Sequence, residues 1–299
     1  MVFDCHVHGP AENGTFWQWH PVTRDAGDMV RYLRDCGVTR VVVSCAGSQR
    51  SRTAEDLVIG NDIAYRLSGD PPGRVPSRAG WAPACGRGRE AKGKASSEVS
   101  PPRQAPAGQE KRSFPGFVTP ACLVNPNFLE ASLAELERAA ARGVCWVGEL
   151  CGYIAGYPFT SPTGGATAQF AEIVARASAL GMVLHLHAGT EEMGRLADAY
   201  PRARFVIAHI GDSAQHCAER IDMVASHPNV HMDISGAGSE RVGILELAVT
   251  RIGADRVLFG SDFTINDPGT VLARIQRAYL TDAEREKVLH ENVARLLGP

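Results

Sequence analysis

The chain has 299 residues, of which 44% are hydrophobic and 21% are charged, so it is long enough to bury a sizeable core. Its 31 basic and 33 acidic residues give a formal net charge of −2, which favours binding to neither nucleic acid nor an anionic membrane. No apolar run approaches the roughly 20 residues of a membrane span, and the first residues lack the basic and apolar regions of a secretion signal. We therefore expect a cytoplasmic protein.

The cysteine pattern agrees with this expectation. Eight cysteines are spread along the chain, and no two of them form a C-x-x-C pair. We interpret them as reduced thiols that serve mostly as small core residues.

Short apolar runs alternate with amphipathic runs along most of the chain. The apolar runs predict strands at 2–8, 39–46, 114–126, 144–150, 182–188, 204–211, 229–235 and 255–262. The amphipathic runs predict helices at 23–37, 53–69, 128–143, 168–181, 191–201, 213–228 and 240–253, with two more near the C-terminus. Eight such units predict an α/β fold, the (β/α)8 TIM barrel. An open doubly wound sheet is the alternative, although no G-x-G-x-x-G follows the first strand.

Residues 70–113 interrupt this alternation. The segment is rich in Pro, Gly, Ser, Ala, Arg and Lys and has almost no periodic apolar pattern. It predicts a disordered insertion in a single barrel domain that spans 1–299. The insertion falls in a helix-to-strand loop, away from the active-site face. We interpret it as a tolerated surface insertion, and its basic bias leaves a partner-binding tail as the alternative.

Polar groups gather at the carboxyl ends of the predicted strands, where barrel enzymes place their catalytic residues. They are His6, His8, Glu149, His185, His187, His209 and Asp262. Because side chains alternate across a strand, His6 and His8 point the same way. The same rule puts His185 and His187 on one side, and His187 lies nearer the strand end. We expect His187 to reach the site and His185 to lie one layer deeper.

Metal binding explains this set economically, because imidazole and carboxylate suit zinc and also manganese, iron or nickel. Such an ion lowers the pKa of its bound water to about 7. Simpler interpretations exist for single residues. A buried histidine often serves only the core, and Asp262 could cap a helix. Glu149 could bind metal, contact substrate or pair with a basic residue.

Several segments of the sequence resemble the amidohydrolase superfamily of metal-dependent barrel enzymes. The matching segments are FDCHVH, LHLHAG, FVIAHIGD, VLFGSDF and ENVARLLG. The branch that they resemble is the amidohydrolase-related group called amidohydrolase 2, which contains hydrolases of small molecules and metal-dependent decarboxylases. The resemblance implies His6, His8, His187 and Asp262 as ligands of a first ion. It makes His209 an acid or base, an electrophile, or a ligand of a second ion.

The segment WVGELCGY, which overlaps the fourth predicted strand (strand 4, 144–150), is similar to the GEIGLDY-type motif of TatD-like hydrolases. That similarity implies a role for Glu149 in a two-metal site, although Gly152 departs from the motif. Strand 4 lacks the lysine that is carbamylated in urease-like members, so a carbamate-bridged site is not expected. The number of ions, one or two, depends on Glu149.

These patterns lead to three functional hypotheses. The first is a metal-dependent hydrolase in which metal-activated water, oriented by Asp262 and assisted by His209, attacks a small molecule. The second is a metal-dependent decarboxylase of an aromatic or muconate-type acid. The third is a non-catalytic scaffold that keeps the barrel. We expect zinc, with manganese as the alternative.

The loops suggest how substrate is bound. The candidate substrate-binding residues are Trp17, Trp19, Arg52, Tyr153 and Asp233. The aromatic residues could instead anchor a subunit interface, Arg52 could be a surface residue, and Asp233 could cap a helix. We expect a small-molecule substrate and a homo-oligomer, most simply a dimer.

Overall fold

The computed structural model describes residues 1–10, 25–69 and 112–298. Within these ranges all strand pairings between neighbours are parallel. The strands are β1 (Phe3–Gly9), β2 (Arg40–Cys45), β3 (Val118–Pro120), β4 (Trp146–Leu150), β5 (Val183–Leu186), β6 (Arg204–Ile207), β7 (Val230–Asp233) and β8 (Val257–Leu258). All but β1 lie inside the range that the sequence predicts, and β1 extends one residue beyond it, to Gly9.

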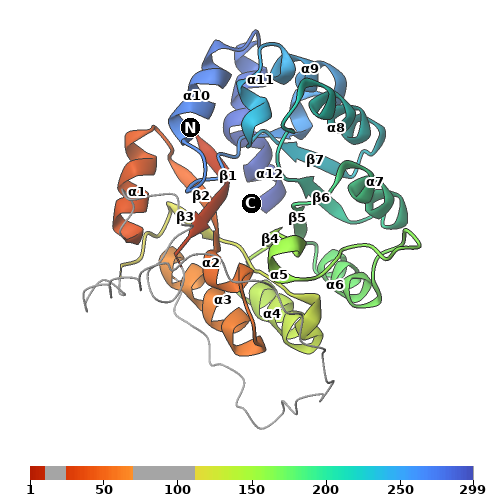
Figure 1. Cartoon of the computed structure of the whole chain (residues 1–299). Helices are drawn as coiled ribbons and strands as arrows, with labels where there is room; N and C mark the ends of the chain where they lie inside the picture. The colour runs from red at the N-terminus through yellow and green to blue at the C-terminus, as the bar shows by residue number, and fades with distance from the viewer. Residues whose placement is uncertain (11–24, 70–111, 299) are drawn as a thin grey trace, which may run out of the picture.

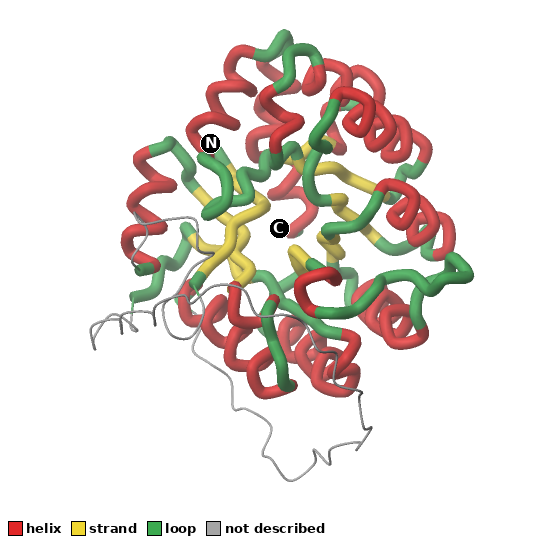
Figure 2. Tube along the Cα trace, in the orientation of Figure 1, coloured by secondary structure: helices red, strands yellow, loops and turns green. Residues whose placement is uncertain are grey.

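The strands close on themselves. Regular pairing links β1-β2-β3 in one sheet and β4-β5-β6-β7-β8 in another. Parallel bridges join the two sheets on both sides, between Cys122 and Val147 and between Val7 and Phe263. The yellow strands therefore form a ring with most of the red helices around it, and the C-terminal helix is seen across the opening of the ring (Figure 2). This ring is a (β/α)8 barrel, so the barrel prediction is confirmed and the open doubly wound sheet is wrong.

Helices follow the strands in chain order (Figure 1). The longer ones are α1 (Ala26–Asp35), α3 (Ala54–Ser68), α4 (Leu129–Ala141), α6 (Ala168–Ala179), α7 (Thr190–Ala199), α8 (Ala214–Ser226), α9 (Ile244–Ile252) and α10 (Pro268–Arg277). The chain ends in α11 (Asp282–Glu286), the π turn η5 (Lys287–Glu291) and α12 (Asn292–Leu297). Side-chain caps such as Asp25 and Thr53 fix where several helices begin.

Four short helical segments were not predicted: α2 (Ala46–Gln49), α5 (Gly152–Ala155) and the 3-10 turns η2 (Pro126–Phe128) and η3 (Ala237–Glu240). All four lie in loops that follow strands. They are too short for a periodic pattern to mark them in the sequence. A fifth, the 3-10 turn η4 (Ala254–Arg256), directly precedes β8.

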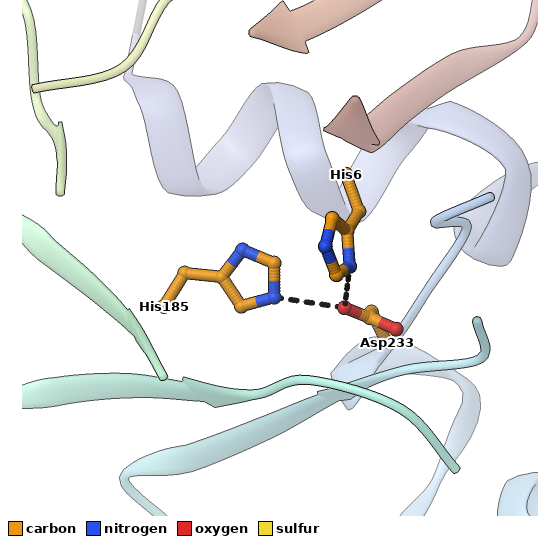
Figure 3. A group of neighbouring side chains, drawn as sticks. All are labelled: His6, His185 and Asp233. Atoms are coloured by element: carbon orange, nitrogen blue, oxygen red, sulfur yellow. Dashed lines mark hydrogen bonds and ion pairs between the residues drawn. The ribbon is translucent and has the colours of Figure 1, made fainter. Parts of the chain in front are cut away.

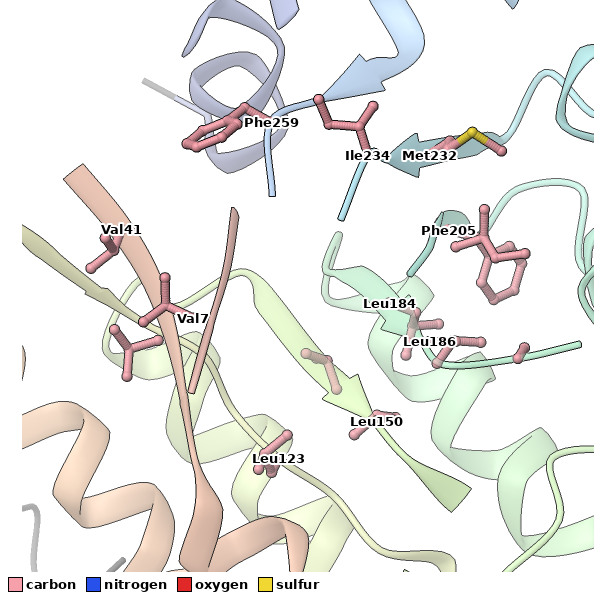
Figure 4. Packing of buried hydrophobic residues seen from close by; sticks show 14 of the residues in the cluster. Val7, Val41, Leu123, Leu150, Leu184, Leu186, Phe205, Met232, Ile234 and Phe259 are labelled. Atoms are coloured by element: carbon pink, nitrogen blue, oxygen red, sulfur yellow. The ribbon is translucent and has the colours of Figure 1, made fainter. Parts of the chain in front are cut away.

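Two apolar clusters hold the barrel together. The larger lies between the strands and the outer helices and includes Phe205 and Met232 (Figure 4). The smaller lies inside the barrel, where Trp146 and Val206 meet Val293 of α12. The C-terminal helix therefore contributes to the interior packing, and the polar groups described below lie toward the carboxyl ends of the strands. None of the described helices is long and apolar enough to cross a membrane.

The surroundings of His231 on β7 predict how the free energy of unfolding changes at acidic pH. Burial and the positive charges of Arg256, Arg295 and Arg204 lower the pKa of His231 to about 4. In the unfolded chain it takes up a proton near its ordinary pKa of about 6.5. Between these values the unfolded state binds more protons, so stability falls as the pH drops from about 6.5 to 4, by about 3 kcal/mol at most.

Replacing His231 by glutamine should therefore flatten this part of the pH–stability profile. The free energy of unfolding, measured by urea titration at several pH values, checks the prediction. His290→Gln is the control, because His290 pairs with Glu286 and has a side chain that is 20% exposed. Parallel profiles for wild type and His231→Gln would contradict the assignment.

Candidate metal centre

The barrel brings the predicted polar residues to one end. His6 and His8 lie on β1, Glu149 on β4 and His185 on β5, whereas the other three lie in loops that follow strands. His187 follows β5, His209 follows β6 and Asp262 follows β8. Residues that lie far apart in the sequence therefore share the carboxyl end of the barrel.

Three side chains converge on one point. The Oδ1 atom of Asp262 lies 2.9 Å from Nε2 of His8 and 3.4 Å from Nε2 of His6. All three residues are buried, and their donor atoms form a group of the size that holds a metal ion. Nε2 of His6 is a buried atom without a hydrogen-bond partner in the described structure. A divalent cation would satisfy that nitrogen and both neighbouring donors, so the residues fit a metal ion.

Glu149 lies between this group and a second one. Its Oε2 atom is 3.3 Å from Nε2 of His6 and 3.6 Å from Nε2 of His8. Its Oε1 atom faces the other way, 3.0 Å from Nδ1 of His187 and 3.4 Å from Nε2 of His209. His187 Nδ1 and His209 Nε2 are themselves 3.0 Å apart. The carboxylate can thus serve one ion through one oxygen and a second ion through the other.

The charges of the centre are strongly coupled. Burial opposes the ionised form of Glu149, but the charge of His6 and hydrogen bonds from histidines outweigh it and lower the pKa of Glu149 well below its usual range. Burial likewise opposes the protonated form of His6, but the charges of Glu149, Asp262 and Asp233 raise the pKa of His6 well above its usual range. A proton on His6 and a metal ion are alternative ways to balance these buried carboxylates.

The charge of Glu149 also affects the pKa of His209. Burial would lower its pKa, but the hydrogen bond and negative charge of Glu149 outweigh burial and raise the pKa of His209. On its other side, Nδ1 of His209 lies 2.8 Å from the Ser235 hydroxyl. Its side chain is 17% exposed, so it lies at the edge of the buried group.

Asp233, at the end of β7, orients the rings of His6 and His185 through hydrogen bonds (Figure 3). Its Oδ2 atom accepts hydrogen bonds from Nδ1 of His6 at 3.0 Å and Nε2 of His185 at 2.8 Å. Its Oδ1 atom accepts from the backbone N–H of Ser235 at 2.8 Å and of His209 at 3.1 Å. The bond to Nδ1 leaves Nε2 of His6 free to bind metal. Asp233 is fully buried, so this position favours ligand orientation over the predicted substrate contact.

Unusual backbone conformations place the functional groups. His209 (φ 66°) and Asp262 (φ 61°) adopt left-handed conformations, which are rare for residues other than glycine and concentrate at functional sites. Next to Glu149, Gly148 (φ 115°) has no space for a side chain, because a Cβ atom there would lie 2.2 Å from the carbonyl oxygen of His185. Glycine at this position lets β4 approach β5 closely.

The remaining predicted residues lie in several places. Trp17 and Trp19 fall outside the described residues, as do positions 70–111 of the predicted insertion. Tyr153 is 71% exposed, and its ring centroid lies 5.1 Å from that of His187, so it borders the centre. Arg52 is exposed, and its backbone N–H donates to Asp56 at the start of α3. Among the described residues, Arg52 makes no hydrogen bond or ion pair with the centre.

Two neighbours of Glu149 were not anticipated. The thiol of Cys151 donates to Oε2 of Glu149 at 2.9 Å, and the side-chain amide of Gln49 donates to its backbone oxygen at 3.1 Å. Cys151 lies two residues after a strand-end glutamate, and this spacing could have indicated the contact between them. Gln49 comes from α2, and no sequence signal marks that contact.

The chain is similar to known proteins of one family. A family model described as amidohydrolase matches residues 103–298, which is more than half of the chain. A curated relative, the gamma-resorcylate decarboxylase of Rhizobium radiobacter, is 26% identical over 117 residues, covering 34% of this chain and 36% of the relative. The aligned region thus spans about a third of that relative's length.

Solved structures share the fold over nearly the whole chain. A 2,6-dihydroxybenzoate decarboxylase from Rhizobium has a TM-score of 0.66 and 15% identity, covering 99% of this chain and 98% of that one. A dihydroxybenzoic acid decarboxylase from Polaromonas, solved with bound manganese and an inhibitor, has a TM-score of 0.64 and 16% identity, covering 99% and 96%. At these identities the likeness shows the fold.

Proposed function

This chain belongs to the amidohydrolase family, and on that premise we propose that it is a metal-dependent decarboxylase of a hydroxylated aromatic acid. The observation that carries the metal dependence is the convergence of His6, His8 and Asp262, where Nε2 of His6 has no hydrogen-bond partner in the described structure. The named relatives support the choice of decarboxylation over the hydrolysis expected from the sequence. The manganese in one of them supports manganese beside zinc as the ion to test.

His6, His8 and Asp262 would hold the ion, with Glu149 in reach of the same position. A divalent ion bound there would supply positive charge that holds and orients the carboxylate and hydroxyl oxygens of the substrate. Asp233 keeps the His6 ring in the orientation that this binding needs.

Decarboxylation of an aromatic acid requires one proton at the ring carbon that loses carbon dioxide. His209 is the residue placed to deliver it, because its Nε2 atom points toward Glu149 and His187 at the edge of the centre. The Ser235 hydroxyl fixes the ring from the Nδ1 side. His187, whose side chain is 32% exposed and whose Nδ1 lies 3.0 Å from Nε2 of His209, can pass a replacement proton from solvent.

Tyr153 provides an aromatic surface beside this proton donor. Burial and neighbouring negative charge raise the pKa of Tyr153 to about 12, so its phenol stays neutral at physiological pH. Its exposed ring can pack against the ring of an aromatic substrate. This arrangement favours an aromatic acid as the substrate class.

The test is release of carbon dioxide from a panel of hydroxybenzoates, including 2,6-dihydroxybenzoate, by protein loaded with manganese or zinc. We expect turnover of at least one member of the panel and loss of turnover on chelation. Tyr153→Leu should raise KM more than it lowers kcat, because it removes ring packing and leaves the proton donor in place. A metal-loaded protein that releases no carbon dioxide from any member would contradict the proposal.

A second candidate function, hydrolysis of a small molecule, is favoured by the position of Glu149. Its two oxygens face two separate donor groups, His6 with His8 and His187 with His209. Two ions bridged by a carboxylate are an arrangement suited to hydrolysis. The metal count separates the candidates.

Native mass spectrometry gives that count. The hydrolase candidate predicts two ions in the wild type and fewer than two in Glu149→Gln, together with cleavage of a lactone panel. The decarboxylase candidate predicts one ion in the wild type. Gln215→Ala is a control, since Gln215 is exposed on α8 and its side-chain amide donates to Glu219, away from the centre.

A further inference from the structure

Arg220 of α8 is a buried cation, 5% exposed, that lies behind the metal centre. Its guanidinium donates to three backbone carbonyls. One terminal nitrogen reaches the oxygen of Ala208 at 2.5 Å and that of His209 at 2.8 Å. The other terminal nitrogen reaches the oxygen of Ala188 at 2.6 Å. Within the described ranges, none of its hydrogen bonds goes to a carboxylate.

The three carbonyls belong to the chain segments that carry two site histidines. Ala188 directly follows His187 beyond the end of β5, and Ala208 directly precedes His209 beyond the end of β6. One side chain therefore connects the two loops. These carbonyls lie past the regular strand pairing, where backbone groups need other partners.

His209 is fixed on both sides of its peptide unit. Its N–H donates to Oδ1 of Asp233 at 3.1 Å, and its carbonyl accepts from Arg220. Between these two contacts the residue adopts its left-handed conformation. Such a conformation persists only where surrounding contacts hold it.

The rest of the guanidinium is also occupied. Its Nε–H donates to Nε2 of His216 at 3.0 Å, and Nδ1 of His216 donates to Asp212 at 2.8 Å. The planar fork of arginine thus makes contacts in three directions at once. Lysine, with one ammonium group, cannot reproduce this geometry.

We propose that Arg220 is a positioning residue that holds His187 and His209 in place against Glu149 by joining the carbonyls beyond β5 and β6. The inference rests on the metal centre of the proposed function and not on the reaction that is catalysed. On this proposal, a residue of the outer helix α8 helps to set the geometry of the centre.

Cobalt(II) binding, followed by equilibrium titration and by the visible absorption of the bound ion, tests this proposal. Because His187 and His209 both contact Glu149, which is in reach of the ion, we expect Arg220→Met to bind cobalt about 10-fold or more weakly and to show an altered spectrum, as is typical when a residue that orients ligands is lost. Arg220→Lys should fall between Arg220→Met and wild type, because it keeps the charge but reaches fewer carbonyls.

Arg256→Met is the matched control. Arg256 also donates to several backbone carbonyls, those of Val224, His227 and Val230, but none of these residues is in the centre. It should lower the thermal midpoint and leave the cobalt affinity and spectrum unchanged. Wild-type affinity and spectrum in both Arg220 variants would overturn the positioning role, as would equal losses in the Arg256 variant. Failure of the wild type to bind cobalt would instead overturn the metal centre itself.

Discussion

Replacement of Asp262 by asparagine is expected to weaken metal binding by more than about 100-fold and to abolish turnover, while the protein still folds. Asparagine keeps the shape of the side chain and tolerates the left-handed backbone of residue 262. It removes the negative charge that faces Nε2 of His6 and of His8. Because a neutral amide is a weaker ligand than a carboxylate for a divalent ion, the loss falls on metal binding first.

Thermal unfolding with and without manganese checks this expectation. At a metal concentration of 100 times Kd, the wild type should gain about 2.7 kcal/mol of stability and Asp262→Asn almost none. Asp255→Asn is the control, because Asp255 is more than half exposed and pairs with Lys287. An Asp262→Asn protein that keeps wild-type stabilisation by manganese would remove Asp262 from the ligand set.

Replacement of His209 by asparagine is expected to lower kcat for decarboxylation by about 10²- to 10⁴-fold, the usual contribution of a general acid. Asparagine again tolerates the left-handed backbone, so the loops beyond β5 and β6 should keep their course. The variant loses the ring nitrogen that carries the proton. The ligands His6, His8 and Asp262 remain, so the first ion should stay bound.

Steady-state kinetics and metal analysis of the same preparation distinguish the roles of His209. A matched control is His227→Asn, since the side chain of His227 is 18% exposed, close to the 17% of His209, and faces Asp198 instead of the centre. An undiminished kcat would contradict the assignment of His209 as proton donor. Loss of an ion together with kcat would make His209 a ligand, as the two-ion hydrolase candidate requires.

Much of this architecture could be predicted from the sequence. Strands buried on both faces leave continuous apolar runs, and each run here overlaps the strand found in the structure, although the runs 114–126, 204–211 and 255–262 extend several residues beyond the strand ends. Alternation along β1 predicts that His6 and His8 share a side, and the barrel rule places their partners at the same end. These are local patterns combined with one topological rule.

The supporting contacts could not be predicted in the same way. Asp233 reads in the sequence as a strand-end carboxylate, but its partners His6 and His185 lie 227 and 48 residues away. The left-handed backbone of His209 could not be predicted, because no glycine stands at that position to indicate it. Arg220 looks like any charged residue of an amphipathic helix, and only the packed structure shows that its guanidinium is buried.

The most direct test of the metal centre is an anomalous diffraction map from crystals of the manganese-loaded protein. The structure predicts a peak bound by Nε2 of His6, Nε2 of His8 and Oδ1 of Asp262, and no peak at that position in crystals of Asp262→Asn. A loaded, active protein with no anomalous peak beside these three atoms would contradict the account.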